Sequence, residues 1–186
     1  MIPVKVTPQT TVLVVDVQER LLSVMGDEGA RVVAQASTLT ALAGAFGARV
    51  VYTEQYPKGL GPTHEGLKAE LDAVEAAYVD KVHFDALGAP DFDARAGALG
   101  ERVVLCGMET HICVLATARS LIERGHQVLV PFDAVCSRYA DHKANGLEQL
   151  RQAGALITNT ETLVFGTLGN AKHPHFKTFS KRIAAT

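Results

Sequence analysis

The chain alternates between short apolar runs and segments in which apolar residues recur at steps of three and four. Residues 11–18, TVLVVDVQ, form a continuous β-branched run that ends in polar side chains, as expected of a parallel strand buried on both faces. Similar runs predict further strands at 48–56, at the start of 76–87, and at 101–109, 126–135 (where Pro131 marks the end) and near 155–165.

Amphipathic helices are predicted between these strands. Residues 30–46 carry apolar side chains at helical spacing and end at Gly47. Further helices are predicted from about His111 to Arg124, over roughly 140–153, and in the tail at 173–183. Residues 57–63, PKGLGPT, contain two prolines and two glycines, so no regular structure is expected there.

Strands that alternate with helices predict βαβ units and a parallel sheet covered on both faces. With right-handed crossovers this gives a doubly wound α/β fold, a three-layer α/β/α sandwich. We find no internal repeat or linker, and we expect a single domain over residues 1–186. The ligand site of such a sheet lies outside the carboxyl ends of the strands.

Charge and composition narrow the classes of partner. The formal net charge of -2 comes from 18 basic and 20 acidic residues spread along the chain, with no basic footprint for nucleic acid or an anionic membrane. No targeting segment or apolar run of membrane-spanning length is visible, so a cytoplasmic protein is expected. Cys106, Cys113 and Cys136 are odd in number and contain no CxxC pair, which favours reduced thiols.

Three chemically useful residues fall at the carboxyl edge of the predicted sheet. Asp16 ends the first strand, Lys81 ends the third, and Cys113 follows the fourth at the start of a helix. A helix N-terminus and a nearby ammonium lower a thiol pKa, so a reactive thiolate is expected. Asp16 would then take the thiol proton and return it to a leaving group, and Lys81 would orient Asp16. The pattern indicates a cysteine hydrolase.

Each residue also has a purely structural interpretation. Cys113 could be a small core residue, Asp16 a helix cap, and Lys81 a solvated surface side chain. For Cys106 and Cys136 the structural interpretation is favoured. His64, His83 and His111 could line a pocket or could equally be ordinary hydrogen-bonded histidines.

The motifs VVDVQ (14–18), DKVHFDA (80–86) and GMETHICV (107–114) resemble those of the isochorismatase-like cysteine hydrolase superfamily. The segments at 53–63 and 165–177 are most similar to its isochorismatase-domain-containing hydrolases of poorly defined substrate. The resemblance implies a six-stranded parallel sheet in order 3-2-1-4-5-6 and a catalytic triad of Asp16, Lys81 and Cys113. It also implies a cis peptide between Met108 and Glu109, with the N–H groups of Glu109 and Cys113 forming an oxyanion hole.

This chain differs from two better-known branches of the superfamily, and the differences narrow the function that the resemblance implies. Nicotinamidases of the superfamily hold a divalent metal after the second strand, whereas this chain offers only His64 there, so no metal or cofactor is expected. True isochorismatases commonly lack the cysteine, so its presence favours acyl transfer from a small amide, carbamate or related carbonyl compound. Gln18, Tyr56 and His111 are the expected substrate contacts. Because relatives with this fold usually associate, we expect a homo-oligomer.

Three other functions stay open at this stage. The fold could support vinyl ether hydrolysis in the isochorismatase manner, a redox-sensing thiol, or a binding protein without turnover.

Overall fold

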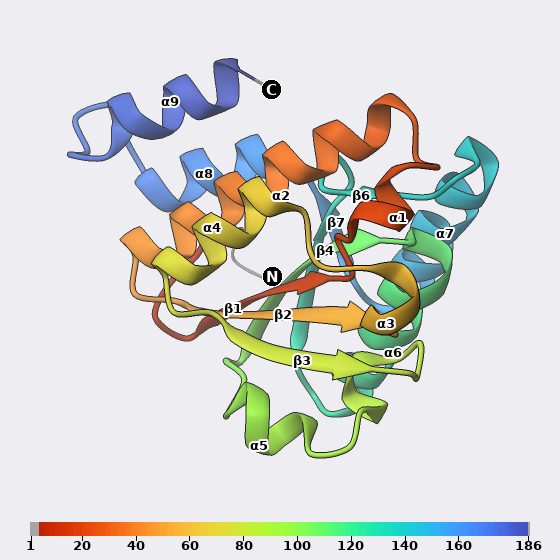
Figure 1. Cartoon of the computed structure of the whole chain (residues 1–186). Coiled ribbons are helices and arrows are strands. Elements are labelled where there is room, and N and C mark those ends of the chain that lie inside the picture. Colours follow the sequence, from red (N-terminus) through yellow and green to blue (C-terminus); the bar gives the residue numbers. More distant parts are fainter. Residues whose placement is uncertain (1–3, 186) are drawn as a thin grey trace.

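A parallel sheet with helices on both faces organises the chain in the computed structural model, which describes residues 4–185 (Figure 1). The main strands are β1 (Thr10–Val15), β2 (Arg49–Gln55), β3 (Ala77–Lys81), β4 (Arg102–Met108), β5 (Gln127–Pro131) and β7 (Leu156–Thr158). Their order is β3-β2-β1-β4-β5-β7, all parallel. The predicted α/β fold and the order 3-2-1-4-5-6 are therefore confirmed, with β7 as the sixth predicted strand. A two-residue strand that was not predicted, β6 (Val135–Cys136), also pairs with β4.

The central strand β1 explains why its sequence is apolar at consecutive positions. It lies between β2 and β4, so that Val12 is beside Val50 on one side and Val104 on the other. Leu13 and Val15 pack into the core on one face of the sheet, while Val12 and Val14 pack into the core on the other. Both faces of the strand therefore need apolar side chains.

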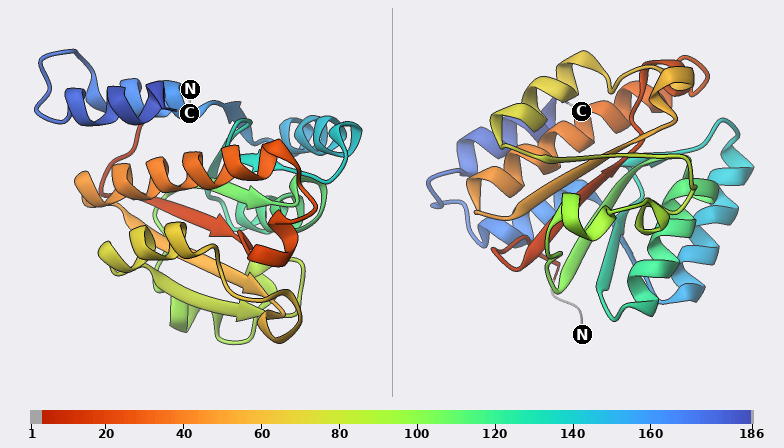
Figure 2. Two further views of the ribbon diagram at one scale, coloured as in Figure 1. Left: turned by 45° about the horizontal axis from the view of Figure 1, so that its top comes forward. Right: turned by 60° about the horizontal axis from the view of Figure 1, so that its bottom comes forward.

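Helices cover the two faces in separate layers, as Figures 1 and 2 show. On one face, α2, α4 and α8 supply core side chains, and α9 packs outside them. On the other face, α5, α6 and α7 do so. Their bounds are α2 (Asp27–Ala45), α4 (Glu65–Ala73), α5 (Phe92–Ala96), α6 (Leu115–Glu123), α7 (Ala140–Ala153), α8 (Thr160–Leu168) and α9 (Phe176–Ala184). Across the described part of the chain, none of the helices has the length and apolar character needed to cross a membrane.

Four local features differ from the sequence-based predictions. Residues 57–63 were expected to lack regular structure, yet Pro57–Leu60 form the short helix α3, with proline at a first-turn position where no N–H is needed. The strand expected near 155–165 ends at Thr158, and Asn159 then caps α8 by accepting from Thr162 N–H. Helix α4 was missed, and the helix expected from His111 begins with a π-helical turn, Thr110–Val114.

The carboxyl ends of β1 and β4 approach each other closely because of a glycine. Gly107 in β4 has φ +116°, and a Cβ at this position would collide with the carbonyl oxygen of Val15. The close approach brings the end of β1 next to the π-helical turn that follows β4, so the two predicted motifs at these strand ends become neighbours.

Candidate active site

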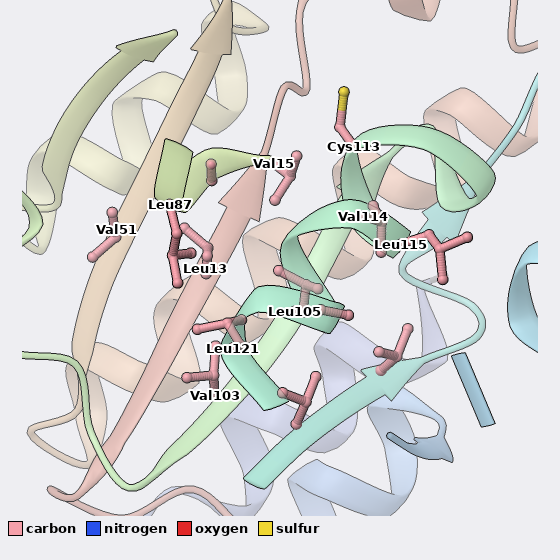
Figure 3. Packing of buried hydrophobic residues seen from close by; sticks show 14 of the residues in the cluster. Leu13, Val15, Val51, Leu87, Val103, Leu105, Cys113, Val114, Leu115 and Leu121 are labelled. Carbon is pink, nitrogen blue, oxygen red and sulfur yellow. The ribbon is translucent and has the colours of Figure 1, made fainter. Parts of the chain in front are cut away.

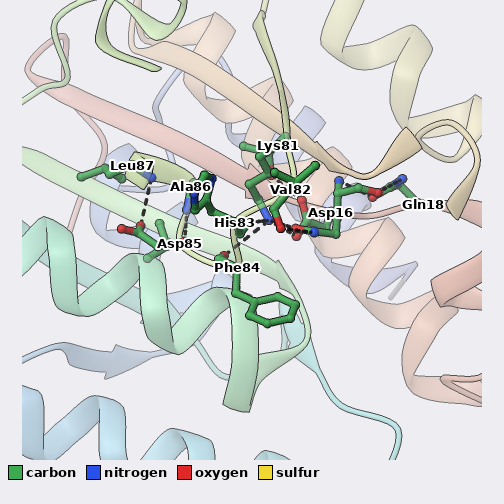
Figure 4. Close-up of polar contacts among 12 residues, drawn as sticks. Asp16, Gln18, Lys81, Val82, His83, Phe84, Asp85, Ala86 and Leu87 are labelled. Atoms are coloured by element: carbon green, nitrogen blue, oxygen red, sulfur yellow. Dashed lines mark hydrogen bonds and ion pairs between the residues drawn. The ribbon is translucent and has the colours of Figure 1, made fainter. Parts of the chain in front are cut away.

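A buried ion pair lies at the carboxyl ends of β1 and β3 (Figure 4). Lys81 Nζ is 2.6 Å from Asp16 Oδ2, and neither side chain has any exposed area. Between them in the sheet, β2 supplies Thr53, whose Oγ1 donates to Asp16 Oδ1 at 2.6 Å. Lys81 also donates to Gln55 Oε1 at 2.7 Å. Buried charges persist in proteins when they are paired and hydrogen-bonded in this way.

The geometry excludes two of the structural interpretations. The residue that precedes helix α1 (Glu19–Leu22) is Gln18, and no side chain caps this helix, so Asp16 is not its cap. Lys81 is buried and therefore is not a solvated surface lysine. Asp16 itself adopts φ 55°, a left-handed conformation that is unusual outside glycine and typical of functional positions when the surrounding structure enforces it.

Cys113 lies in the π-helical turn after β4 and is 7% exposed. In Figure 3 its sulfur points away from the apolar side chains of the cluster below it. Burial and the Asp16 carboxylate together raise the pKa of the Cys113 thiol to about 12, and the Lys81 ammonium opposes them only partly. Asp16 and Lys81 thus lie close enough to act on the sulfur, and we call the three residues the Asp–Lys–Cys cluster.

The direction of this pKa shift corrects the sequence-based expectation of a thiolate. Withdrawal of the sulfur from water disfavours its anion, and the adjacent carboxylate disfavours a second negative charge. The Lys81 ammonium, which was expected to lower the thiol pKa, is already paired with Asp16. At neutral pH the thiol is therefore protonated.

A small pocket of about 110 Å³ opens beside Cys113. Eight residues line it: Leu21, Gln55, Leu60, Phe84, Met108, Glu109, Ile112 and Cys113. The sulfur is therefore accessible from a cavity rather than sealed inside the core. Among the lining residues, Leu21, Gln55, Leu60, Phe84 and Ile112 were not singled out from the sequence, although Leu60 and Phe84 are apolar residues within segments predicted to be loops at the edge where ligands bind.

The turn that carries Cys113 is fixed at its start. The peptide bond between Met108 and Glu109 is cis, as the resemblance implied. The carbonyl oxygen of Glu109 accepts from the N–H groups of Ile112 and Val114, and its carboxylate accepts from the N–H of Arg138 at 2.8 Å. On the other side, Gly146 of α7 lies so close to this turn that a Cβ would be tight against His111 Cα, at 3.0 Å.

None of the three expected substrate contacts is among the residues that line the pocket. Gln18 is fully buried; its Nε2 donates to the carbonyls of Gln55 (3.1 Å) and Gly61 (2.6 Å), and its Oε1 accepts from Gln55 N–H (2.7 Å). Gln18 therefore holds residues 55–61, the segment that contains α3, and its amide is not free to face a ligand. The side chain of Tyr56 is 55% exposed. His111 Nδ1 is hydrogen-bonded to Ser137 Oγ at 2.9 Å.

The two other cysteines have the structural surroundings that were favoured for them. Cys106 and Cys136 are buried and free, and burial raises the pKa of each to about 12. Within residues 4–185, no group of three or more His, Cys, Asp or Glu side chains is arranged to hold a metal ion.

These observations define a doubly wound parallel α/β protein with a small pocket at the carboxyl edge of its sheet, where proteins of this architecture bind ligands. Residues 10–162 match the model of the isochorismatase domain. The chain belongs to the isochorismatase family of hydrolases.

Named relatives extend the match over most of the chain. Isochorismatase domain-containing protein 2 of Bos taurus is 36% identical over 180 residues, covering 96% of this chain and 85% of that protein. The secreted isochorismatase effector Isc1 of Phytophthora sojae is 36% identical over 151 residues, covering 79% and 71%. Among solved structures, a Caenorhabditis elegans protein titled MAR1 ribonuclease has a TM-score of 0.84 and 34% identity, with 97% of this chain and 92% of that chain covered.

Proposed function

We propose that this protein is a cofactor-independent cysteine hydrolase that cleaves a small amide, carbamate or related carbonyl compound through a thioester on Cys113. The observation that carries the proposal is a thiol that lines a small pocket and interacts with a buried carboxylate and its paired ammonium. A nucleophile beside a base that a third group orients is the general arrangement of covalent hydrolases.

In the proposed mechanism the thiol loses its proton only as it reacts. As Cys113 Sγ attacks the substrate carbonyl carbon, the proton moves to the Asp16 carboxylate, which Lys81 and Thr53 hold in place. The carbonyl oxygen becomes an oxyanion, which the N–H groups of Glu109 and Cys113 stabilise. Collapse breaks the carbon–nitrogen bond, and Asp16 gives its proton to the leaving nitrogen, so that a thioester remains.

Water completes the cycle in the reverse sense. Asp16 takes a proton from the attacking water, the oxygen adds to the thioester carbon, and the carbon–sulfur bond breaks. The proton returns to the sulfur, and a carboxylic acid leaves. Lys81 keeps its charge throughout, which offsets the carboxylate whenever Asp16 is ionised.

Several observations favour this reaction over the alternatives. A pocket of about 110 Å³ and a net charge of -2 favour a small molecule over a nucleic acid, even though the Caenorhabditis elegans neighbour is titled a ribonuclease. A thiol with a raised pKa is a poor redox sensor because the thiolate is the oxidisable form. A thiol that lines the pocket also favours acyl transfer over vinyl ether hydrolysis, since true isochorismatases commonly lack this cysteine.

The test is trapping of the thioester. Intact mass spectrometry after rapid quenching should show acylation of the protein by members of a panel of small amides and activated esters, and Cys113→Ala should abolish it. Cys136→Ala is the matched control, since it also removes a buried free thiol, and it should be acylated normally. Turnover should be lost in Asp16→Asn and Lys81→Ala. If the whole panel leaves Cys113 unmodified and no amide is hydrolysed, the proposal is wrong.

The proposed setting is a cytoplasmic homo-oligomer. Three free, buried cysteines are consistent with a reducing compartment. Cell fractionation and light scattering would test the location and the assembly.

A further inference from the structure

The walls of the pocket beside Cys113 are mainly apolar. Leu21, Leu60, Phe84, Met108 and Ile112 supply five of its eight lining residues. The volume of about 110 Å³ is well below the roughly 300–1,000 Å³ of pockets for drug-sized ligands. It corresponds to about four water molecules at roughly 30 Å³ each, which leaves room for a ligand of roughly four to six non-hydrogen atoms.

The two polar side chains in the wall are already engaged elsewhere. Gln55 Oε1 accepts from Lys81 Nζ at 2.7 Å, and Gln55 Nε2 donates to the carbonyl oxygen of Val82 at 2.9 Å. The Glu109 carboxylate accepts from the backbone N–H of Arg138 at 2.8 Å and pairs with its guanidinium at 3.3 Å. Both side chains therefore already have partners within the protein.

The charges near the sulfur also disfavour an ionised ligand. Lys81 is the cation of the Asp–Lys–Cys cluster, and its charge is compensated by Asp16 at 2.6 Å. A carboxylate on the substrate would enter beside the anions Asp16 and Glu109, and an ammonium would lose its water among five apolar side chains. The carboxylate would be desolvated beside like charges, and the ammonium would meet only carboxylates whose charge Lys81 and Arg138 already offset, so both ligands are disfavoured.

We propose that the substrate is a short, uncharged aliphatic amide whose acyl group has two to four carbons. This inference rests on the proposed function and adds the substrate class. The acyl chain packs against the apolar wall, and the carbonyl carbon lies at the sulfur. Phe84, on the segment after β3 (Figure 4), lines the pocket and sets the chain length that the pocket accepts.

The experiment compares kcat/KM for ammonia release from a graded panel. Acetamide, propionamide and butyramide test chain length, and hexanamide tests the upper limit. Each added methylene should raise kcat/KM about fourfold up to butyramide, from the usual ~0.8 kcal/mol per buried CH₂, and hexanamide should fall below butyramide. Malonamate and 3-aminopropionamide add a charge at nearly the size of butyramide, and each should be at least about a hundredfold poorer than butyramide.

A matched pair of variants tests the wall itself. Phe84→Ala should move the optimum toward hexanamide, because the ring lines the pocket. Phe132→Ala makes the same truncation at a 41% exposed residue outside the pocket lining and should leave the order of substrates unchanged. An unchanged order in folded Phe84→Ala would overturn the assignment of the wall.

The failures can be told apart. If Cys113 is acylated but a charged or longer amide is turned over faster than butyramide, the substrate class is wrong and the cysteine hydrolase stands. If no amide in the panel is hydrolysed and Cys113 never carries an acyl group, the proposed function fails and the substrate class fails with it.

Discussion

Replacement of Asp16 by asparagine should change two properties of Cys113 in opposite directions. The carboxylate helps to raise the thiol pKa to about 12, so its removal lowers that pKa and exposes more thiolate at a given pH. The same carboxylate is the proposed proton acceptor in turnover, so its removal stops hydrolysis. Alkylation of Cys113 should therefore become faster while ammonia release is lost.

The size of the alkylation effect follows from two opposing terms. A neighbouring charge shifts a pKa by about one to three units, and one unit is tenfold in thiolate concentration. The nucleophilicity of the thiolate falls as its pKa falls, along a Brønsted slope of about 0.4–0.5, and this cancels roughly a factor of three of the gain. The net expectation is an alkylation rate about three- to fourfold higher per unit of pKa lowered.

The assay is site-resolved mass spectrometry of iodoacetamide labelling at pH 8. Lys81→Met should have the opposite effect on the thiol pKa, because the Lys81 ammonium lowers that pKa. Cys113 should therefore be labelled more slowly in this variant than in the unsubstituted protein. Thr53→Val removes a hydrogen bond to Asp16 but keeps the carboxylate, so it serves as a control for local disturbance. Unfolding curves for each variant show that the labelling is of folded protein. Slower or unchanged labelling of folded Asp16→Asn would refute the electrostatic coupling between the two residues.

Other expected outcomes concern stability and pH. Lys81→Met leaves the Asp16 carboxylate buried without its cation, and urea unfolding should show a loss of about 3–5 kcal/mol; a loss below about 1 kcal/mol would contradict the buried pair. Gln18→Ala removes three hydrogen bonds to backbone groups of Gln55 and Gly61. Limited proteolysis should therefore cut residues 55–61, the segment that contains α3, faster than in the unsubstituted protein. Because the pKa of Cys113 is raised from 9.0 to about 12 in the folded state, the thiol's contribution to stability is present below pH 9 and is lost as pH rises toward 12. Its labelling should also rise about tenfold per pH unit from pH 7 to 10, and a plateau near neutrality would show a thiolate.

The fold could be predicted because its strands are buried on both faces. In β1 the residues from Val12 to Val15 pack alternately into the cores on the two faces of the sheet. Every position in this run therefore needs an apolar side chain. The meeting of Asp16, Lys81 and the turn of Cys113 follows from the strand order, since β3, β2, β1 and β4 are consecutive and parallel. Polar residues at the carboxyl ends of such strands share an edge regardless of their separation along the chain.

Local features with weak sequence signals were missed. Helix α4 buries only Leu67 and Leu71, one apolar pair at a four-residue step, which is too short a pattern to separate from a loop. Gln18 is only two residues from Asp16 in the sequence, but its side-chain amide donates hydrogen bonds to the backbone carbonyls of Gln55 and Gly61. Such long-range partners carry no local pattern.

The sign of the Cys113 pKa shift shows what motif-level reasoning leaves out. The sequence placed an ammonium and a helix start near the thiol, and both favour a thiolate. The structure adds the depth of the sulfur and the pairing of Lys81 with Asp16, and these reverse the balance. A protonated resting thiol needs a proton acceptor at the moment of attack, and Asp16 is the carboxylate that acts most strongly on the sulfur. In the proposed reaction, Cys113 and Asp16 are therefore activated together by substrate, which is why the two properties measured in Asp16→Asn should move in opposite directions.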